Sequence, residues 1–106
     1  MSIFVEAMFL LLPPDAGGRE APIAPRDGSY RPFARHGGRV VRARLFEGPP
    51  RLGPGEEGRV MIELESDGAG DTEGIGRGAE LQILEHGERV VGLLTVLRVC
   101  RSPVSV

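Results

Sequence analysis

At 106 residues, with 41% hydrophobic and 26% charged residues, the chain has the size of one domain with a single core, and its composition excludes an intrinsically disordered protein. Lysine is absent, so all thirteen basic residues are arginine, and against fifteen acidic residues they leave a net charge of −2. This balance excludes a uniformly basic nucleic-acid binder. It allows one basic face, because the charges are unevenly distributed: residues 1–53 carry eight arginines and five acids, and residues 54–106 carry five arginines and ten acids.

The first predicted element is a strand over residues 3–12, in which apolar residues occupy both faces. One face carries Ile3, Val5, Ala7, Phe9 and Leu11, and the other carries Met8, Leu10 and Leu12. This pattern predicts burial of the first face and partial burial of the second. Because the run is too short to span a bilayer, lacks a basic start and is interrupted by Glu6, we expect a strand and not a signal or membrane segment.

Glycine and proline predict the connections that follow. Residues 15–18 end in Gly17-Gly18 and predict a turn, because glycine tolerates positive φ. Residues 20–29 contain Pro22 and Pro25 and predict an irregular loop. Residues 30–35 predict a short second strand.

Two strands with clear alternation are predicted over residues 39–47 and 59–65. The residues expected to point inward are Val41, Ala43, Leu45, Val60, Ile62 and Leu64. Residues 66–78 contain five glycines and three acids, and they predict a mobile loop.

A hairpin closes the predicted fold, with strands over residues 80–85 and 89–99 joined across residues 86–88. No segment of ten or more residues has a helical period, and six short antiparallel strands are typical of a sandwich or a closed barrel. We therefore predict an all-β domain over residues 1–100, a six-stranded antiparallel Greek-key β-barrel, followed by a tail over residues 101–106. The predicted core is Val5, Phe9, Val41, Ala43, Leu45, Val60, Ile62, Leu64, Leu81, Ile83, Val91, Leu93 and Leu97.

Three motifs occur in a fixed order along these elements. They are Gly17-Gly18-Arg19, Tyr30-Arg31-Pro32 and the hairpin run from Glu85 to Gly92. In order and separation they resemble the third domain of elongation factor Tu, over about residues 3–99. In that family the domain is a six-stranded barrel that packs on the GTPase domain, binds the T-stem of aminoacyl-tRNA and contacts the nucleotide exchange factor. The resemblance implies a non-enzymatic module that contacts tRNA or another translation component.

The resemblance also implies how individual residues act. Glu85 falls on a family glutamate that contacts the T-stem, whereas Phe33 replaces a tRNA-contacting glutamine and Val40 lies near the position of a tRNA-contacting threonine. A carboxylate at a hairpin tip can accept a hydrogen bond from the exocyclic amine of guanine. We therefore expect an exposed Glu85 whose replacement by alanine leaves folding stability unchanged. Without lysine the chain cannot form the phosphate-binding loop of a GTPase, which predicts no GTP binding.

The densest group of arginines lies between residues 31 and 44, with aromatic residues among them. Guanidinium groups bind phosphate and aromatic rings stack on bases, so this group predicts an RNA-binding surface, and the resemblance implies that the RNA is tRNA or ribosomal RNA. The candidate RNA-binding residues are Arg31, Phe33, Arg35, Arg39, Arg42 and Arg44, with Glu85 added by the resemblance. The alternative is a solvated strand face whose arginines pair with the acids of residues 56–65.

A protein-interaction module is the alternative function. Five apolar residues alternate onto faces that should point outward: Val40, Phe46, Met61, Leu84 and Leu94. Together they predict an apolar patch that a partner or a second copy of the chain would cover, and the resemblance implies a translation factor or GTPase as that partner.

No pattern predicts catalysis, a cofactor or a metal. Cys100 could pair with His36 or His86 as nucleophile and base, but it is expected to follow the last strand, in a frayed tail. Residues 67–73 lack the spacing of a calcium loop, and two isolated histidines with one distant cysteine do not form a zinc site. One cysteine excludes an internal disulfide and, with no membrane segment, predicts a cytoplasmic protein.

Overall fold

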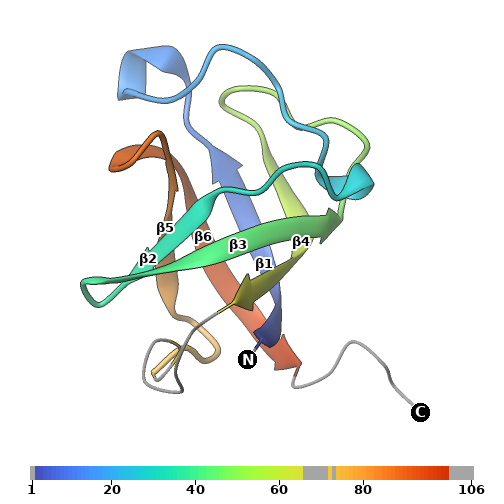
Figure 1. The fold of residues 1–106 in the computed structure, drawn as a ribbon. Coiled ribbons are helices and arrows are strands. Elements are labelled where there is room, and N and C mark those ends of the chain that lie inside the picture. Colours follow the sequence, from blue (N-terminus) through green and yellow to red (C-terminus); the bar gives the residue numbers. More distant parts are fainter. Residues whose placement is uncertain (1, 66–71, 73, 101–106) are drawn as a thin grey trace.

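The computed structural model describes residues 2–65, 72 and 74–100, and its strands close into one antiparallel barrel (Figure 1). The strands are β1 (Ser2–Leu11), β2 (Phe33–His36), β3 (Arg39–Glu47), β4 (Glu57–Glu65), β5 (Glu80–Glu85) and β6 (Arg89–Cys100). Around the barrel they follow the order β1-β4-β3-β2-β5-β6, and β6 pairs with β1 to close it. After β2, β3 and β4, strand β5 returns to lie beside β2, which is Greek-key connectivity. The predicted six-stranded barrel is confirmed.

Side-chain alternation places one face of each strand inside the barrel. In β1 the five predicted inward residues are buried and the residues of the other face are half-buried, as the sequence predicts. The six inward residues predicted for β3 and β4 are also buried. Each strand pairs with a neighbour on both sides, so the barrel has no open edge at which another chain could add a strand.

A β-bulge in β6 makes the predicted core position Leu93 wrong. The register between β5 and β6 shifts by one residue after Ile83, so Val91 is an extra residue in β6. Beyond this bulge the alternation is reversed, and Leu94 is fully buried while Leu93 is 40% exposed.

A second bulge makes the predicted core position Leu97 wrong. The register between β1 and β6 shifts between Glu6 and Ala7, and Leu97 is the extra residue. Leu97 is consequently half-buried. After this bulge Val99 again packs against the core.

Three connections lie at the same end of the barrel (Figure 1): the β1–β2 connection, the β3–β4 loop and the β5–β6 hairpin. The first contains two short 3-10 helices, η1 (Pro14–Ala16) and η2 (Pro25–Asp27). Ile23 in this connection forms two backbone hydrogen bonds of 2.9 Å with Leu52 of the β3–β4 loop, and both side chains are buried. These residues cover the end of the core. Gly17 has φ +84°, which confirms the turn predicted at residues 15–18.

Other predicted boundaries differ from the structure. Strand β2 begins at Phe33, although the carbonyl oxygens of Tyr30 and Pro32 already accept hydrogen bonds from β3. Cys100 is the last residue of β6, so its predicted position beyond the last strand is wrong. Residues 66–71 and 73 of the predicted mobile loop and the predicted tail over residues 101–106 lie outside the described residues.

Candidate nucleic-acid interface

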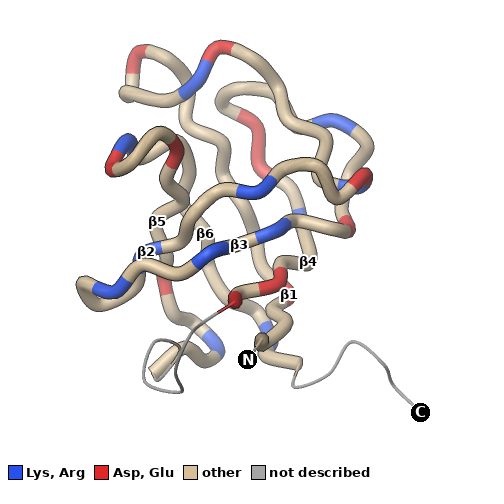
Figure 2. Tube along the Cα trace, viewed as in Figure 1, with Lys and Arg blue, Asp and Glu red and all other residues tan. Residues whose placement is uncertain are grey.

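The outer surface of β2 and β3 carries most of the predicted arginine group. Phe33 on β2 lies opposite Arg42 on β3, and Arg35 lies opposite Val40. Residues two apart on a strand share a face, so Arg44 projects on the same side as Arg42. Figure 2 shows these basic positions gathered along β2 and β3, with acidic positions at the end of β4. We call Arg31, Phe33, Arg35, Arg42 and Arg44 the arginine face. Arg39 begins β3 at the exposed β2–β3 turn and is not part of this row.

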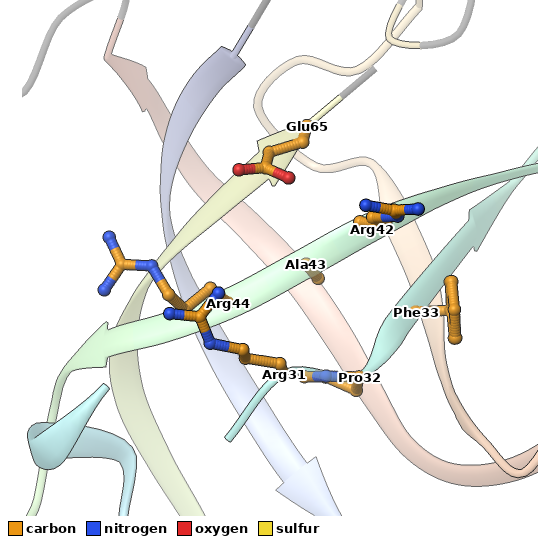
Figure 3. A pocket seen from close by; sticks show the side chains of 7 residues that line it. All are labelled: Arg31, Pro32, Phe33, Arg42, Ala43, Arg44 and Glu65. Carbon is orange, nitrogen blue, oxygen red and sulfur yellow. The ribbon is translucent and has the colours of Figure 1, made fainter. Parts of the chain in front are cut away.

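A hollow of about 190 Å³ lies in the arginine face (Figure 3). It is lined by Arg31, Pro32, Phe33, Arg42, Ala43, Arg44 and Glu65. In Figure 3 the side chains of Arg31 and Arg44 extend to one side of Pro32, and Phe33 lies on the other side. Glu65 pairs with Arg42 in the strand register and lies on the rim opposite Pro32 and Phe33. The hollow therefore lies around Ala43, with three arginines beside it and a carboxylate on one rim.

Two of the predicted arginines are held by neighbouring side chains. Arg44 donates to Glu63 Oε1 through Nε at 3.2 Å and Nη2 at 3.0 Å, and its guanidinium lies 5.2 Å from the ring centroid of Phe46. Arg35 Nε donates to Gln82 Oε1 at 2.7 Å. Pairing with the acids of residues 56–65, the predicted alternative, is therefore correct for Arg44.

Arg31 and Arg42 differ from Arg35 and Arg44. Both are exposed, and within the described part of the chain their side chains form no hydrogen bond or ion pair. A guanidinium group presents five donors in a planar fork that matches phosphate oxygens. These two residues are the arginines of the hollow whose donors are available to an anion.

The predicted exposure of Glu85 is wrong. Its Oε2 accepts a hydrogen bond from Tyr30 Oη at 2.5 Å and forms an ion pair with Arg19 Nη1 at 2.5 Å. Only 16% of the Glu85 side chain is exposed, and the Arg19 guanidinium also lies 5.5 Å from the Tyr30 ring centroid. In this Arg19–Tyr30–Glu85 cluster one carboxylate oxygen, Oε2, already accepts from both partners. Arg19 and Tyr30 were absent from the predicted site, although both belong to the motifs that carry the resemblance.

The surroundings of Tyr30 change its acidity. Burial raises the pKa of the Tyr30 hydroxyl, and the hydrogen bond to Glu85 and the charge of Glu85 raise the pKa further. The loop before Tyr30 is fixed by Asp27, whose Oδ1 accepts hydrogen bonds from Ser29 N at 2.8 Å and Ser29 Oγ at 2.6 Å. These hydrogen bonds from Ser29 lower the pKa of Asp27. Because its pKa is raised, the Tyr30 hydroxyl stays protonated and donates to Glu85.

The arginine-lined hollow adjoins two others toward the β5–β6 hairpin. It shares Arg31, Pro32 and Phe33 with a hollow of about 240 Å³, which is also lined by residues of the Arg19–Tyr30–Glu85 cluster. That hollow shares Arg19, Glu85 and His86 with a third of about 540 Å³, which Arg89 also lines. The combined surface carries the arginines Arg19, Arg31, Arg42, Arg44 and Arg89 and the acids Glu20, Glu65 and Glu85.

A further hollow of about 480 Å³ lies over β1, β4 and β6, and its charges are more nearly balanced. Glu6 lies between two arginines there, 3.8 Å from Arg59 Nη1 and 3.4 Å from Arg98 Nε. Glu47 also lines it. Because its carboxylates already pair with or adjoin its arginines, this hollow offers less net positive charge than the arginine face.

The predicted apolar patch does not form. Leu84 and Leu94 are fully buried, and Phe46 and Met61 are half-buried. Phe46 packs edge to face against Phe4, with ring centroids 5.9 Å apart. Of the five predicted residues Val40 alone is exposed, at 50%. An exposed apolar patch therefore no longer supports the alternative of a protein-interaction module.

Among the described residues, no three histidine, cysteine or acidic side chains come close enough to hold a metal ion. The described segments also contain no helix that is long and apolar enough to cross a membrane. In comparisons with known proteins, the chain matches no family model. The curated proteins likewise include no significant match.

Proposed function

We propose that this barrel is a non-enzymatic RNA-binding module that contacts tRNA, ribosomal RNA or another component of translation in the cytoplasm. The observation that carries this proposal is the pair of exposed arginines, Arg31 and Arg42, whose donors no described residue engages. They line one hollow with the exposed ring of Phe33. Phosphate-binding forks beside an aromatic ring are the elements of a surface that binds an RNA backbone and its bases.

The charge distribution supports one binding face on an acidic protein. The net charge of −2 disfavours polyanion binding over the whole surface. The acids of β4 and β1 are, however, partly neutralised by Arg44, Arg59 and Arg98. The arginine face, in which Arg31 and Arg42 pair with no described residue, thus provides a local positive surface.

The Arg19–Tyr30–Glu85 cluster supports the resemblance to the third domain of elongation factor Tu. Glu85 is 66 residues from Arg19 and 55 residues from Tyr30 in the sequence, and each of these residues belongs to a different one of the three motifs. Their contact gives a physical reason for the three motifs to occur together. In this proposal the cluster fixes the β5–β6 hairpin beside the arginine face, and direct RNA contacts come from the arginines.

Fluorescence anisotropy with labelled bulk tRNA, measured over a series of salt concentrations, tests the proposal. We expect binding at low salt that weakens as salt rises, with a log–log slope of roughly one unit for each neutralised phosphate. Absence of binding at tens of micromolar protein in low salt would contradict the proposal. Sedimentation of the free protein provides the control, because self-association would also change anisotropy.

A further inference from the structure

We infer that Phe33 is a stacking platform for an unpaired nucleobase, so that the RNA bound by the arginine face is single-stranded at this point. This inference rests on the proposed function and names the class of RNA that the site takes. It follows from how the aromatic side chains are used and from which groups surround Phe33.

The chain has four phenylalanines, one tyrosine and no tryptophan, and Phe33 differs from the other aromatic residues. Phe9 is fully buried in the core, Phe4 packs against Phe46, and an arginine lies over the rings of Phe46 and Tyr30. Phe33 is 41% exposed, and among the described residues no arginine or aromatic ring stacks on it. A large apolar ring held at the surface without a partner offers its face to a ligand.

Cations surround this ring on the outer face of the sheet. Arg31 and Arg35 lie two residues before and after Phe33, and Arg42 lies directly opposite on β3. On the other side Phe33 pairs with Leu84 of β5, which is fully buried. A base on the ring would therefore place the phosphates beside it within reach of guanidinium groups.

The same geometry disfavours a continuous duplex. A base within an A-form helix is covered on both faces by its neighbours, so a protruding ring can stack only on a base that has left the helix. Glu65 on the opposite rim repels phosphate and leaves the side with Arg31 and Phe33 for the backbone. The site thus matches one strand with an accessible base.

The test compares a labelled single-stranded RNA of about ten nucleotides with a duplex of the same length. We expect Phe33→Leu, which keeps an apolar side chain but removes the aromatic face, to weaken single-strand binding by about tenfold and duplex binding by less than about twofold. Phe33→Tyr should retain the affinity of the unchanged protein. Leu93→Ala is the matched control, because Leu93 is 40% exposed and lies on β6, with β5 between it and the arginine face.

A second measurement reports stacking directly. Because the chain lacks tryptophan, Phe33→Trp introduces a single indole whose fluorescence the single-stranded RNA should quench and the duplex should not. RNA binding without quenching, together with equal effects of Phe33→Leu on both RNAs, would overturn the inference and leave the proposed function intact. Absence of binding to either RNA would overturn both.

Discussion

Tyr30 is the only tyrosine of the chain, so its ionisation can be followed by the ultraviolet absorbance of the phenolate without interference. Because burial and Glu85 raise its pKa, we expect the folded protein to show no phenolate signal at a pH where free tyrosine, with a pKa of about 10, is half ionised. The neutral hydroxyl therefore stabilises the fold fully below about pH 10, and this contribution is lost as the pH rises above that value. An ordinary tyrosine titration in protein that remains folded would contradict this prediction.

Glu85 holds two partners that come from distant parts of the chain, and its removal should destabilise the fold. We expect Glu85→Ala to lower the free energy of unfolding by about 1–3 kcal/mol, because it leaves the half-buried Tyr30 hydroxyl and Arg19 without their acceptor. Urea unfolding measures the effect. Glu88→Ala, at a side chain that is 90% exposed on the same hairpin, should change stability by less than about 0.5 kcal/mol. Equal stability of the two variants would show that the cluster does not stabilise the hairpin.

The sequence predicted that Arg42 and Arg44 share the outer face of one strand, because alternation depends only on local periodicity, whereas Arg39, which was grouped with them, lies at the β2–β3 turn. The sequence also allowed pairing with the acids of residues 56–65, which is correct for Arg44, but it did not predict that Gln82 holds Arg35 or that Glu85 is covered. These contacts form between strands that are brought together by the barrel, so no local pattern encodes them. The distinction between engaged arginines and the available Arg31 and Arg42 therefore required the structure.

At the scale of strands, the two bulges of β6 show where periodicity gives no answer. Residues 90–94 are apolar at both odd and even positions, apart from Gly92. The pattern therefore does not show whether the odd or the even residues point into the barrel. The extra residue at Val91 decides the phase, and it depends on pairing with β5. By contrast, β3 and β4 carry charged residues on one face, and the predicted inward residues of both strands were correct.

Gly92 next to the first bulge should be required for packing. A Cβ atom there would lie 2.7 Å from Cε1 and 2.8 Å from Cζ of Phe9, whose ring is fully buried and cannot move without disturbing the core. We expect Gly92→Ala to destabilise the protein by about 1–3 kcal/mol in thermal or urea unfolding. Gly76→Ala is the control, since a Cβ atom at Gly76 has nothing within 4 Å and should change stability by less than about 0.5 kcal/mol. If both variants are equally stable, the contact between Gly92 and Phe9 is looser than the structure shows.

At the scale of the molecule, the barrel was predictable because short segments of the sequence indicate each strand, and glycine and proline mark where the strands end. The sequence does not show which strands are neighbours in the closed barrel. In the structure β1 pairs with both β4 and β6, so the first and last strands are neighbours. This arrangement separates the arginine face on β2 and β3 from the paired charges around Glu6. It allows two pairs of arginines on one protein to be compared.

Two double variants compare these pairs of arginines. The first double variant combines Arg31→Gln with Arg42→Gln. The matched control combines Arg59→Gln with Arg98→Gln. Each double variant removes two positive charges from a protein of net charge −2. A nonspecific effect of net charge would weaken tRNA binding equally in both double variants. If the arginine face is the binding surface, the first pair should weaken binding and reduce the salt slope by about two units, one for each lost phosphate contact. The control should leave the slope unchanged, because Arg59 and Arg98 pair with Glu6 on another face. Anisotropy titrations at several salt concentrations measure both quantities, and equal slopes for the two double variants would place the RNA elsewhere on the molecule.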